Sequence, residues 1–381
     1  MQEKRRAIAK DEMQEKRKHG EKKMDKERIA ELAEKYYPYV RELRHEFHKN
    51  PELSWKEIRT SRRVMEELER MGVPYQAHCG NETNVAAYIK GSGSGLGKII
   101  MLRADMDALP IQEDESHELC SETPGVMHAC AHDGHIASML GTVRILNELK
   151  DQFSGTIKIA FEAGEEDGGG AKDFIKAGFL DDVEAVFGCH LFGTVKEGVF
   201  ATRVGDFMSA SDALWLKIRG RGGHSSTPHL AVDPVNIAAQ FITDSQAIVA
   251  RMAAPTDIAV LGFSTIQGGT VYNTIPDEVN ISGSLRCFSE ETRELIRRGM
   301  EGILKGLCQA YGAEYELRYT NTMYAVHNDE RLTKMAVESA AKVVGSDHID
   351  LLQYPQMGSE TFAFYREKAP CCLYYLGIDA G

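Results

Sequence analysis

The stretch Val126–His135, with the sequence VMHACAHDGH, places three His, one Cys and one Asp directly before a predicted apolar helix. Cys130 and His132 are two residues apart, so they cannot share one face of a helix, but both can point inward from an irregular segment. A thiolate and an imidazole together suit a zinc-like transition ion better than Mg²⁺ or Ca²⁺. The alternative is a buried cysteine beside ordinary polar loop residues, and the rest of the chain has to decide between the two.

Composition narrows the class of protein. The chain has 381 residues, enough for two domains that each have a core, and its 43% hydrophobic and 27% charged residues are ordinary for a globular protein. A net charge of −12 argues against a nucleic-acid binder. There is no apolar run of membrane-spanning length and no apolar secretory segment. Eight Cys without regular spacing indicate reduced thiols, so we expect a cytoplasmic protein.

The first part of the chain is predicted to be α/β. Residues 1–28 are a charged run of mixed sign, in which Met1–Arg5 recurs as Met13–Arg17, and we expect a solvated helix or disordered extension without chemistry. Helices are then predicted from residue 29 and over 57–71. Strands over 98–103, 156–161, 184–189 and 371–376 alternate with helices over 135–149, 171–177 and 329–344. This alternation predicts a mainly parallel sheet with helical crossovers.

Acidic and imidazole side chains follow the predicted strands of this sheet. In such sheets ligands bind beyond the carboxyl ends of the strands. We therefore expect these residues to gather at one edge, where the segment with Cys130 and His132 also begins a helix. Burying several carboxylates together is costly without a counter-charge, so the gathering favours a metal site over the structural alternative. The residues that follow strands are Asp105, Asp107, Glu165, Glu166 and His190.

A second domain is predicted inside the first. From about Ser209 the predicted elements run β-α-β-β-α-β, which is the ferredoxin-like arrangement. The expected domains are the extension 1–28, a catalytic metal-binding domain of residues 29–208 and 321–381, and an inserted lid or dimerisation domain of residues 209–320.

Seven motifs follow one another along the chain. They are His45–Thr60, Arg103–Pro110, His128–His135, Glu165-Glu166, Gly223-His224-Ser225, Asn273–Pro276 and Met357-Gly358-Ser359-Glu360. Together they resemble the motifs of the M20 metallopeptidases. The resemblance covers nearly everything after about residue 36 and is to the amidohydrolase branch, which contains N-acyl-amino-acid amidohydrolases, hippurate hydrolases and auxin-conjugate hydrolases.

The resemblance implies a dinuclear metal site and a metal-dependent hydrolysis of N-acyl amino acids or similar small amides. Its ions are expected to be Zn, Mn, Co or Ni. It also implies a homodimer in which His224 of the inserted domain reaches an active site across the interface. The residues that match the family's positions are, as metal ligands, Cys130, His132, Glu166 and His190; as general base, Glu165; as substrate-binding residues, Asn273 and Arg286; and as supports behind the metals, Asp105, Asp107 and Glu360.

Two departures from the family's pattern bear on activity. Gly is usual where this chain has Ala131, and we expect the alanine to be tolerated if its φ is negative and harmful otherwise. The family's fifth ligand is a His beyond the final strand, which this sequence does not reach, so we expect a truncated C-terminus or one under-liganded metal. His327 and His348 are candidates for that ligand only by default.

Other interpretations stay open at this point. Arg286 on a strand could be a surface charge, and Asn273 close to two glycines could be a turn residue. The chain could also be a cysteine hydrolase with Cys130 as nucleophile and His132 as base, or a non-catalytic binding protein that descends from the enzyme. The acyl group, the preferred amino acid and the native metal do not follow from the sequence.

Overall fold

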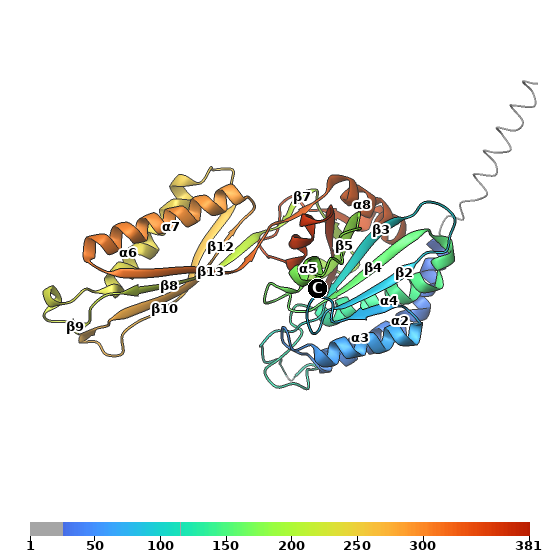
Figure 1. Cartoon of the computed structure of the whole chain (residues 1–381), viewed down its shortest axis with the longest axis horizontal. Coiled ribbons are helices and arrows are strands. Elements are labelled where there is room, and N and C mark those ends of the chain that lie inside the picture. Colours follow the sequence, from blue (N-terminus) through green and yellow to red (C-terminus); the bar gives the residue numbers. More distant parts are fainter. Residues whose placement is uncertain (1–25, 115) are drawn as a thin grey trace, which may run out of the picture.

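The computed structural model describes residues 26–114 and 116–381. Figure 1 shows these residues as two lobes, a larger one built from the blue, green and red parts of the chain and a smaller one built from the yellow and orange parts. Most of the predicted extension, residues 1–25, lies outside the described residues, and helix α2 begins at Lys26. None of the helices in the described ranges is long and apolar enough to cross a membrane.

The larger lobe contains an eight-stranded sheet in the order β1-β2-β4-β3-β5-β16-β6-β15. Its parallel pairings are β4-β3, β3-β5, β5-β16 and β6-β15, whereas the other three neighbouring pairs are antiparallel. The predicted α/β fold with a mainly parallel sheet is therefore confirmed. The strands are β1 Tyr75–Ala77, β2 Val85–Lys90, β3 Lys98–Asp105, β4 Gly155–Glu162, β5 Ala185–Lys196, β6 Phe200–Thr202, β15 Ile349–Leu351 and β16 Cys371–Asp379.

Helices cover both faces of this sheet. Successive side chains of a strand point to opposite faces, and here apolar side chains on both faces are buried. Ala87 of β2 packs in the core below the helices of one face, and its neighbour Ala86 packs in the core of the other face. The first face is covered by α2 (Lys26–Lys49), α3 (Ile58–Met71) and α4 (His132–Glu148), and the second by α5 (Gly170–Lys176) and the short helix η5 (Thr361–Glu367).

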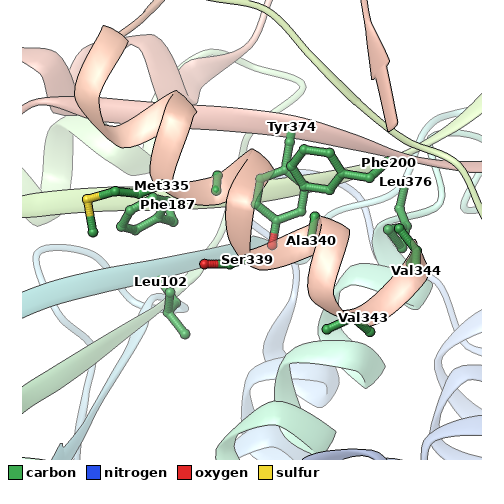
Figure 2. Close-up of a pocket in the computed structure, with 11 residues that line it drawn as sticks. Leu102, Phe187, Phe200, Met335, Ser339, Ala340, Val343, Val344, Tyr374 and Leu376 are labelled. Atoms are coloured by element: carbon green, nitrogen blue, oxygen red, sulfur yellow. The ribbon is translucent and has the colours of Figure 1, made fainter. Parts of the chain in front are cut away.

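Helix α8 (Glu330–Val344) covers the outer part of the first face, where Leu332 packs against Cys372. Between α8 and the sheet lies an apolar cavity of about 430 Å³. Figure 2 shows Leu102, Phe187 and Tyr374 of the sheet facing side chains of α8 across this space. None of the predicted site residues lines the cavity, so it is separate from the candidate metal centre.

The smaller lobe is a four-stranded antiparallel sheet in the order β10-β12-β8-β13, with α6 and α7 on one face. This is the predicted order of elements and the strand order of the ferredoxin-like arrangement. The division of the chain at residues 209 and 320 and the role of this lobe as a lid or dimerisation unit stay predictions. The elements are β8 Ala210–Arg219, α6 Pro234–Ala247, β10 Ala259–Gln267, β12 Glu278–Cys287, α7 Glu290–Tyr311 and β13 Glu314–Met323.

Two predicted boundaries are wrong in ways that matter for the site. Helix α4 begins at His132 rather than at about residue 135, so His132 is its first residue. Strand β5 does not end before His190 but continues to Lys196, because it pairs with β16 beyond the point where its pairing with β3 stops. The last pair between β3 and β5 is Arg103 with Gly188, so His190 lies two residues beyond this last pair and is still on a strand.

Candidate metal centre and active site

Three segments of the larger lobe bring one sulfur and two imidazoles together. Cys130 lies in the turn before α4, His132 opens α4, and His190 lies on β5. One ligand atom of each lies within 4.8 Å of the others, and Cys130 Sγ is 3.4 Å from His190 Nε2. The structure thus gathers these predicted residues, and their role as ligands stays a prediction.

Both imidazoles are anchored through Nδ1. His132 Nδ1 donates to the main-chain carbonyl of Asp107 at 2.9 Å, and His190 Nδ1 donates to the carbonyl of Leu191 at 2.7 Å. Because a carbonyl only accepts, the neutral form of each ring carries its lone pair on Nε2, as in most metal-binding histidines. Burial lowers the pKa of His190 to about 4, which keeps this ring neutral.

The acidic surroundings of His132 favour a positive charge on its ring. Burial opposes a charge on this ring, but the charge of Asp105 and the hydrogen bond to Asp107 outweigh burial and raise its pKa well above the ordinary value. His132 Nε2 is nevertheless buried without a hydrogen-bond partner among the described residues. The acids around His132 thus favour a positive charge at Nε2, and a bound metal ion can supply that charge in place of a proton.

Two carboxylate oxygens beside His132 are also unpartnered. Glu166 Oε1 lies 3.9 Å from His132 Nε2 and, like Asp107 Oδ1, has no hydrogen-bond partner in the described ranges. Asp107 is held by its other oxygen, which accepts from the Ser54 hydroxyl at 2.6 Å and from the N–H of Glu166 at 2.9 Å. Buried polar atoms are rarely left unsatisfied, and a mixed sulfur, nitrogen and oxygen set suits a zinc-like divalent ion. The residues present therefore fit a divalent metal ion.

His135 is close to the cluster but is not available as a ligand. Its Nε2 accepts from the N–H of Leu191 at 2.8 Å, so its Nδ1 carries the proton and donates to Asp105 Oδ1 at 2.5 Å. Both nitrogens are used, although the ring lies within reach of Asp105 and His132. We therefore interpret His135 and Asp105 as a brace behind the cluster.

Ala131, between two predicted ligands, has a left-handed backbone. Its φ is +62° and its ψ is +22°, a conformation that L-alanine adopts only at a cost. Its carbonyl accepts from the N–H groups of Gly134 and His135 and so opens α4. The expectation that alanine is tolerated here required a negative φ, so the structure places this residue in the strained case.

The predicted base, Glu165, is paired with Glu360. Glu165 Oε1 accepts from the N–H of Thr361 at 3.0 Å. Burial, followed by the charge and hydrogen bond of Glu360, raises the pKa of Glu165 well above its usual range. Burial also opposes a charge on Glu360, but Arg103, whose Nη2 donates to Glu360 Oε1 at 2.8 Å, lowers its pKa. Burial and the charge of Glu360 therefore favour the protonated form of Glu165.

The predicted residues of the smaller lobe fall into two groups. His224 and Asn273 lie together, since β9 (Gly223–His224) pairs with β11 (Thr274–Ile275), and Figure 1 shows β9 at the far end of that lobe, away from α4 and β5. A single chain therefore does not bring His224 or Asn273 to the cluster. Arg286, by contrast, donates from Nη1 to the carbonyl of Met357 at 2.7 Å, in the segment that leads to Glu360.

The two default candidates for a further ligand are not at the cluster. His327 binds Asp206 at 2.9 Å in an exposed position, and His348 is exposed in a short helix before β15. Neither belongs to a group of potential ligands in the described parts of the chain.

Several supporting residues were not singled out from the sequence. Trp55 packs its ring against Gly164 and Gly169 on either side of the Glu165-Glu166 pair, and its Nε1 donates to Asp167 at 2.8 Å. Glu57, quoted only within a motif, accepts from the N–H of Gly164 at 2.8 Å. Arg103, also quoted only within a motif, is buried among carboxylates. A lone charged residue within an apolar strand was the available signal for Arg103, whereas nothing in the sequence pointed to Trp55.

Known proteins match this chain over most of its length. The profile of peptidase family M20/M25/M40 matches residues 101–381. Thermostable carboxypeptidase 2 of Saccharolobus solfataricus is 37% identical over 355 residues, which covers 92% of this chain and 88% of the relative. An N-acyl-L-amino acid amidohydrolase of Geobacillus stearothermophilus is 39% identical over 78% of this chain and 80% of its own length.

Solved structures agree with this assignment. The Bacillus subtilis YXEP protein, described as a dinuclear metal binding peptidase from the M20 family, has a TM-score of 0.75 and 31% identity, with 90% of this chain and 89% of that chain covered. These matches confirm the resemblance seen in the motifs. The chain therefore belongs to peptidase family M20/M25/M40 and is a metal-dependent hydrolase of the amidohydrolase and carboxypeptidase type.

Proposed function

We propose that this protein hydrolyses the amide bond of N-acyl amino acids. The observation that carries the proposal is the adjacent pair Glu165 and Glu166. Glu166 presents an unpartnered oxygen to His132 Nε2, and Glu165 beside it is hydrogen-bonded to Thr361. One residue of the pair is thus suited to bind a metal and the other to move a proton.

Two divalent ions, with Zn²⁺, Mn²⁺, Co²⁺ and Ni²⁺ as candidates, would be held by Cys130, His132, Glu166 and His190. When bound, such ions supply Lewis-acid chemistry and lower the pKa of a water molecule toward neutrality. Asp105, Asp107 and Glu360 support this set from behind.

Glu165 is proposed as the general base. A bound cation favours its ionised form, so it can accept a proton from water and later deliver it to the leaving amine. The N–H of Thr361 and the brace from Glu360 keep its carboxyl in place between these two transfers.

Arg286 is proposed to bind the carboxylate of the amino-acid product half. It is half-buried and donates one hydrogen bond to the carbonyl of Met357, and it has no carboxylate partner among the described residues. Its remaining donors can therefore bind a carboxylate in the two-pronged manner typical of Arg.

His224 and Asn273 are proposed to act in the site of a partner subunit. They lie at the far end of the smaller lobe, where His224 is exposed and Asn273 is half-buried, and they do not reach the cluster of their own chain. In a homodimer built through this lobe, His224 would donate to the oxyanion that develops on the amide carbonyl, and Asn273 would hold the substrate.

The cysteine hydrolase is disfavoured by the environment of Cys130. Burial raises the pKa of its thiol, and the imidazole that Sγ contacts, His190, has a pKa lowered to about 4 and is a weak base. A nucleophilic cysteine needs a lowered pKa. A non-catalytic homologue would keep the fold but turn over no amide.

The test compares Glu165→Gln with Glu166→Gln. Glu165→Gln should lower kcat by about 10²–10⁴-fold, as expected for loss of a general base, and keep the metal content of the wild type. Glu166→Gln should lose metal. Both are assayed, with metal content measured, on N-acetyl, N-benzoyl and longer-acyl amino acids after addition of Mn²⁺, Co²⁺ or Zn²⁺. If the metal-loaded wild type hydrolyses none of them, or if thiol alkylation inhibits it but chelators do not, the proposal is refuted.

A further inference from the structure

Arg103 is the most heavily bonded buried cation near the site. It lies on β3 with a side chain that is only 2% exposed. Its guanidinium donates through Nε to Glu162 at 2.7 Å, through Nη1 to Asp105 at 2.6 Å, and through Nη2 to Glu360 at 2.8 Å and the Thr361 hydroxyl at 2.9 Å. One planar group therefore fixes three carboxylates that come from β3, β4 and the start of η5.

One branch from Arg103 leads to the base. Glu360 contacts Glu165, and the N–H of Thr361 donates to Glu165 Oε1 at 3.0 Å. The Thr361 hydroxyl also donates to Glu162 Oε1 at 2.6 Å, so both the main-chain N–H and the side chain of Thr361 are held by carboxylates. The position of the Glu165 carboxyl is thus set through Glu360 and Thr361, both of which Arg103 holds.

The other branch leads to the imidazoles. Asp105 accepts from His135 Nδ1, and His135 Nε2 accepts from the N–H of Leu191, the residue after His190. Asp105 Oδ2, which Arg103 binds, is also 3.6 Å from His132 Nε2. A shift of Arg103 would therefore move the support of His190 and His132 as well as that of Glu165.

We propose that Arg103 is a positioning residue that fixes the base Glu165 relative to the metal-binding histidines through its bonds to Glu360, Thr361 and Asp105. The proposal rests on the proposed amide hydrolysis for its kinetic consequence but not for its geometry. A lysine keeps the charge at this position, but an ammonium is a point charge and cannot span three acids in one plane. Orientation of the carboxylates, rather than charge alone, is what the arginine supplies.

The kinetic test uses Arg103→Lys with Tyr365→Phe as a matched control. Tyr365 is fully buried and donates to Glu162 Oε2 at 2.9 Å, so its variant loses a hydrogen bond of the same network but none to Glu360, Thr361 or Asp105. Arg103→Lys should lower kcat by about 10–100-fold, the scale of a misplacement near 1 Å, with KM within about threefold. The metal content should match that of the wild type. Tyr365→Phe should leave kcat within about threefold.

Thr361→Val tests the same branch without changing charge, and Thr361→Ser restores the hydroxyl. We expect a loss of kcat for valine and recovery for serine. The proposal is overturned if Arg103→Lys keeps wild-type kcat, because its bonds then do not position the base. It is also overturned if Tyr365→Phe loses as much kcat as Arg103→Lys, because the effect is then not specific to the bonds of Arg103.

A structural measurement separates this proposal from the proposed function. Crystals of metal-free Arg103→Lys should show the carboxylate of Glu360 and the N–H of Thr361 displaced from Glu165, while Tyr365→Phe keeps them in place. This outcome supports the positioning role even if the wild type hydrolyses no amide. Unchanged positions of Glu360 and Thr361 in Arg103→Lys refute it even if the enzyme is active.

Discussion

Replacing Ala131 with glycine should stabilise the protein, against the usual effect of glycine. Ala131 has a φ of +62° in the turn that joins Cys130 to His132. A left-handed backbone costs an L-residue about 1–2 kcal/mol, which glycine does not pay. Glycine in turn gives the unfolded chain more freedom, worth about 0.4–1 kcal/mol. The difference predicts that Ala131→Gly raises the free energy of unfolding by about 0.5–1 kcal/mol.

The assay is urea unfolding of the metal-free protein in a chelator, so that metal binding does not add to the difference. Ala247 is the matched control, because it is exposed and has a helical φ of −66° at the end of α6. Ala247→Gly should lower the free energy of unfolding by about 0.8–1 kcal/mol. If Ala131→Gly destabilises as much as Ala247→Gly, the left-handed conformation is not strained and the reasoning fails.

Three further outcomes are expected. Burial raises the pKa of Glu57 from 4.5 to about 7. The unfolded chain therefore ionises Glu57 at lower pH than the folded protein, and the free energy of unfolding should fall by about 3 kcal/mol at most as pH rises from 4.5 through 7. Glu57→Gln should reduce this fall in unfolding curves measured from pH 5 to 8.5. In Gly169→Ala the new Cβ would lie 2.4 Å from the Trp55 ring, so the substitution should lower the free energy of unfolding by about 1–3 kcal/mol and shift Trp fluorescence. In the control Gly302→Ala the new Cβ would have no atom of the described residues within 4 Å beyond the neighbouring helix backbone, so this substitution should not destabilise the protein. Chelation should lower the thermal midpoint, and metal restored at about 100 times its Kd should return about 2.7 kcal/mol; an unchanged midpoint would contradict the metal site.

The gathering of the site was predictable because strand ends of a parallel sheet meet at one edge. Asp105 ends β3, and Glu165-Glu166 follows β4, as the sequence pattern predicts. The exact end of β5 was not predictable, since its extension depends on pairing with β16, which lies almost two hundred residues later in the chain. His190 lies on the part of β5 that continues beyond the last pair with β3 and pairs with β16.

The roles of neighbouring histidines depend on contacts that no pattern contains. His132 and His135 lie in the same motif, yet only the second has both nitrogens bonded. Likewise, the order of motifs along the chain gave no distance between His224 and the cluster, because that distance is set by the length of the smaller lobe. The positive φ of Ala131 could not be inferred either, because alanine usually avoids it.

The buried carboxylates around the cluster outnumber the Arg and Lys side chains that bind them. Asp105, Glu162 and Glu360 share Arg103, and the remaining acids of the cluster, Asp107, Glu165 and Glu166, have no Lys or Arg partner in the described parts of the chain. Burying such carboxylates without compensation is costly, and protonation or a bound cation can remove that cost. The raised pKa of Glu165 and Glu166, caused first by burial, is the response expected when no cation is present. A base must be ionised to act. If Glu165 is the base, as proposed, a cation that activates water would also favour its ionised form, so metal binding and base function are expected to be gained or lost together.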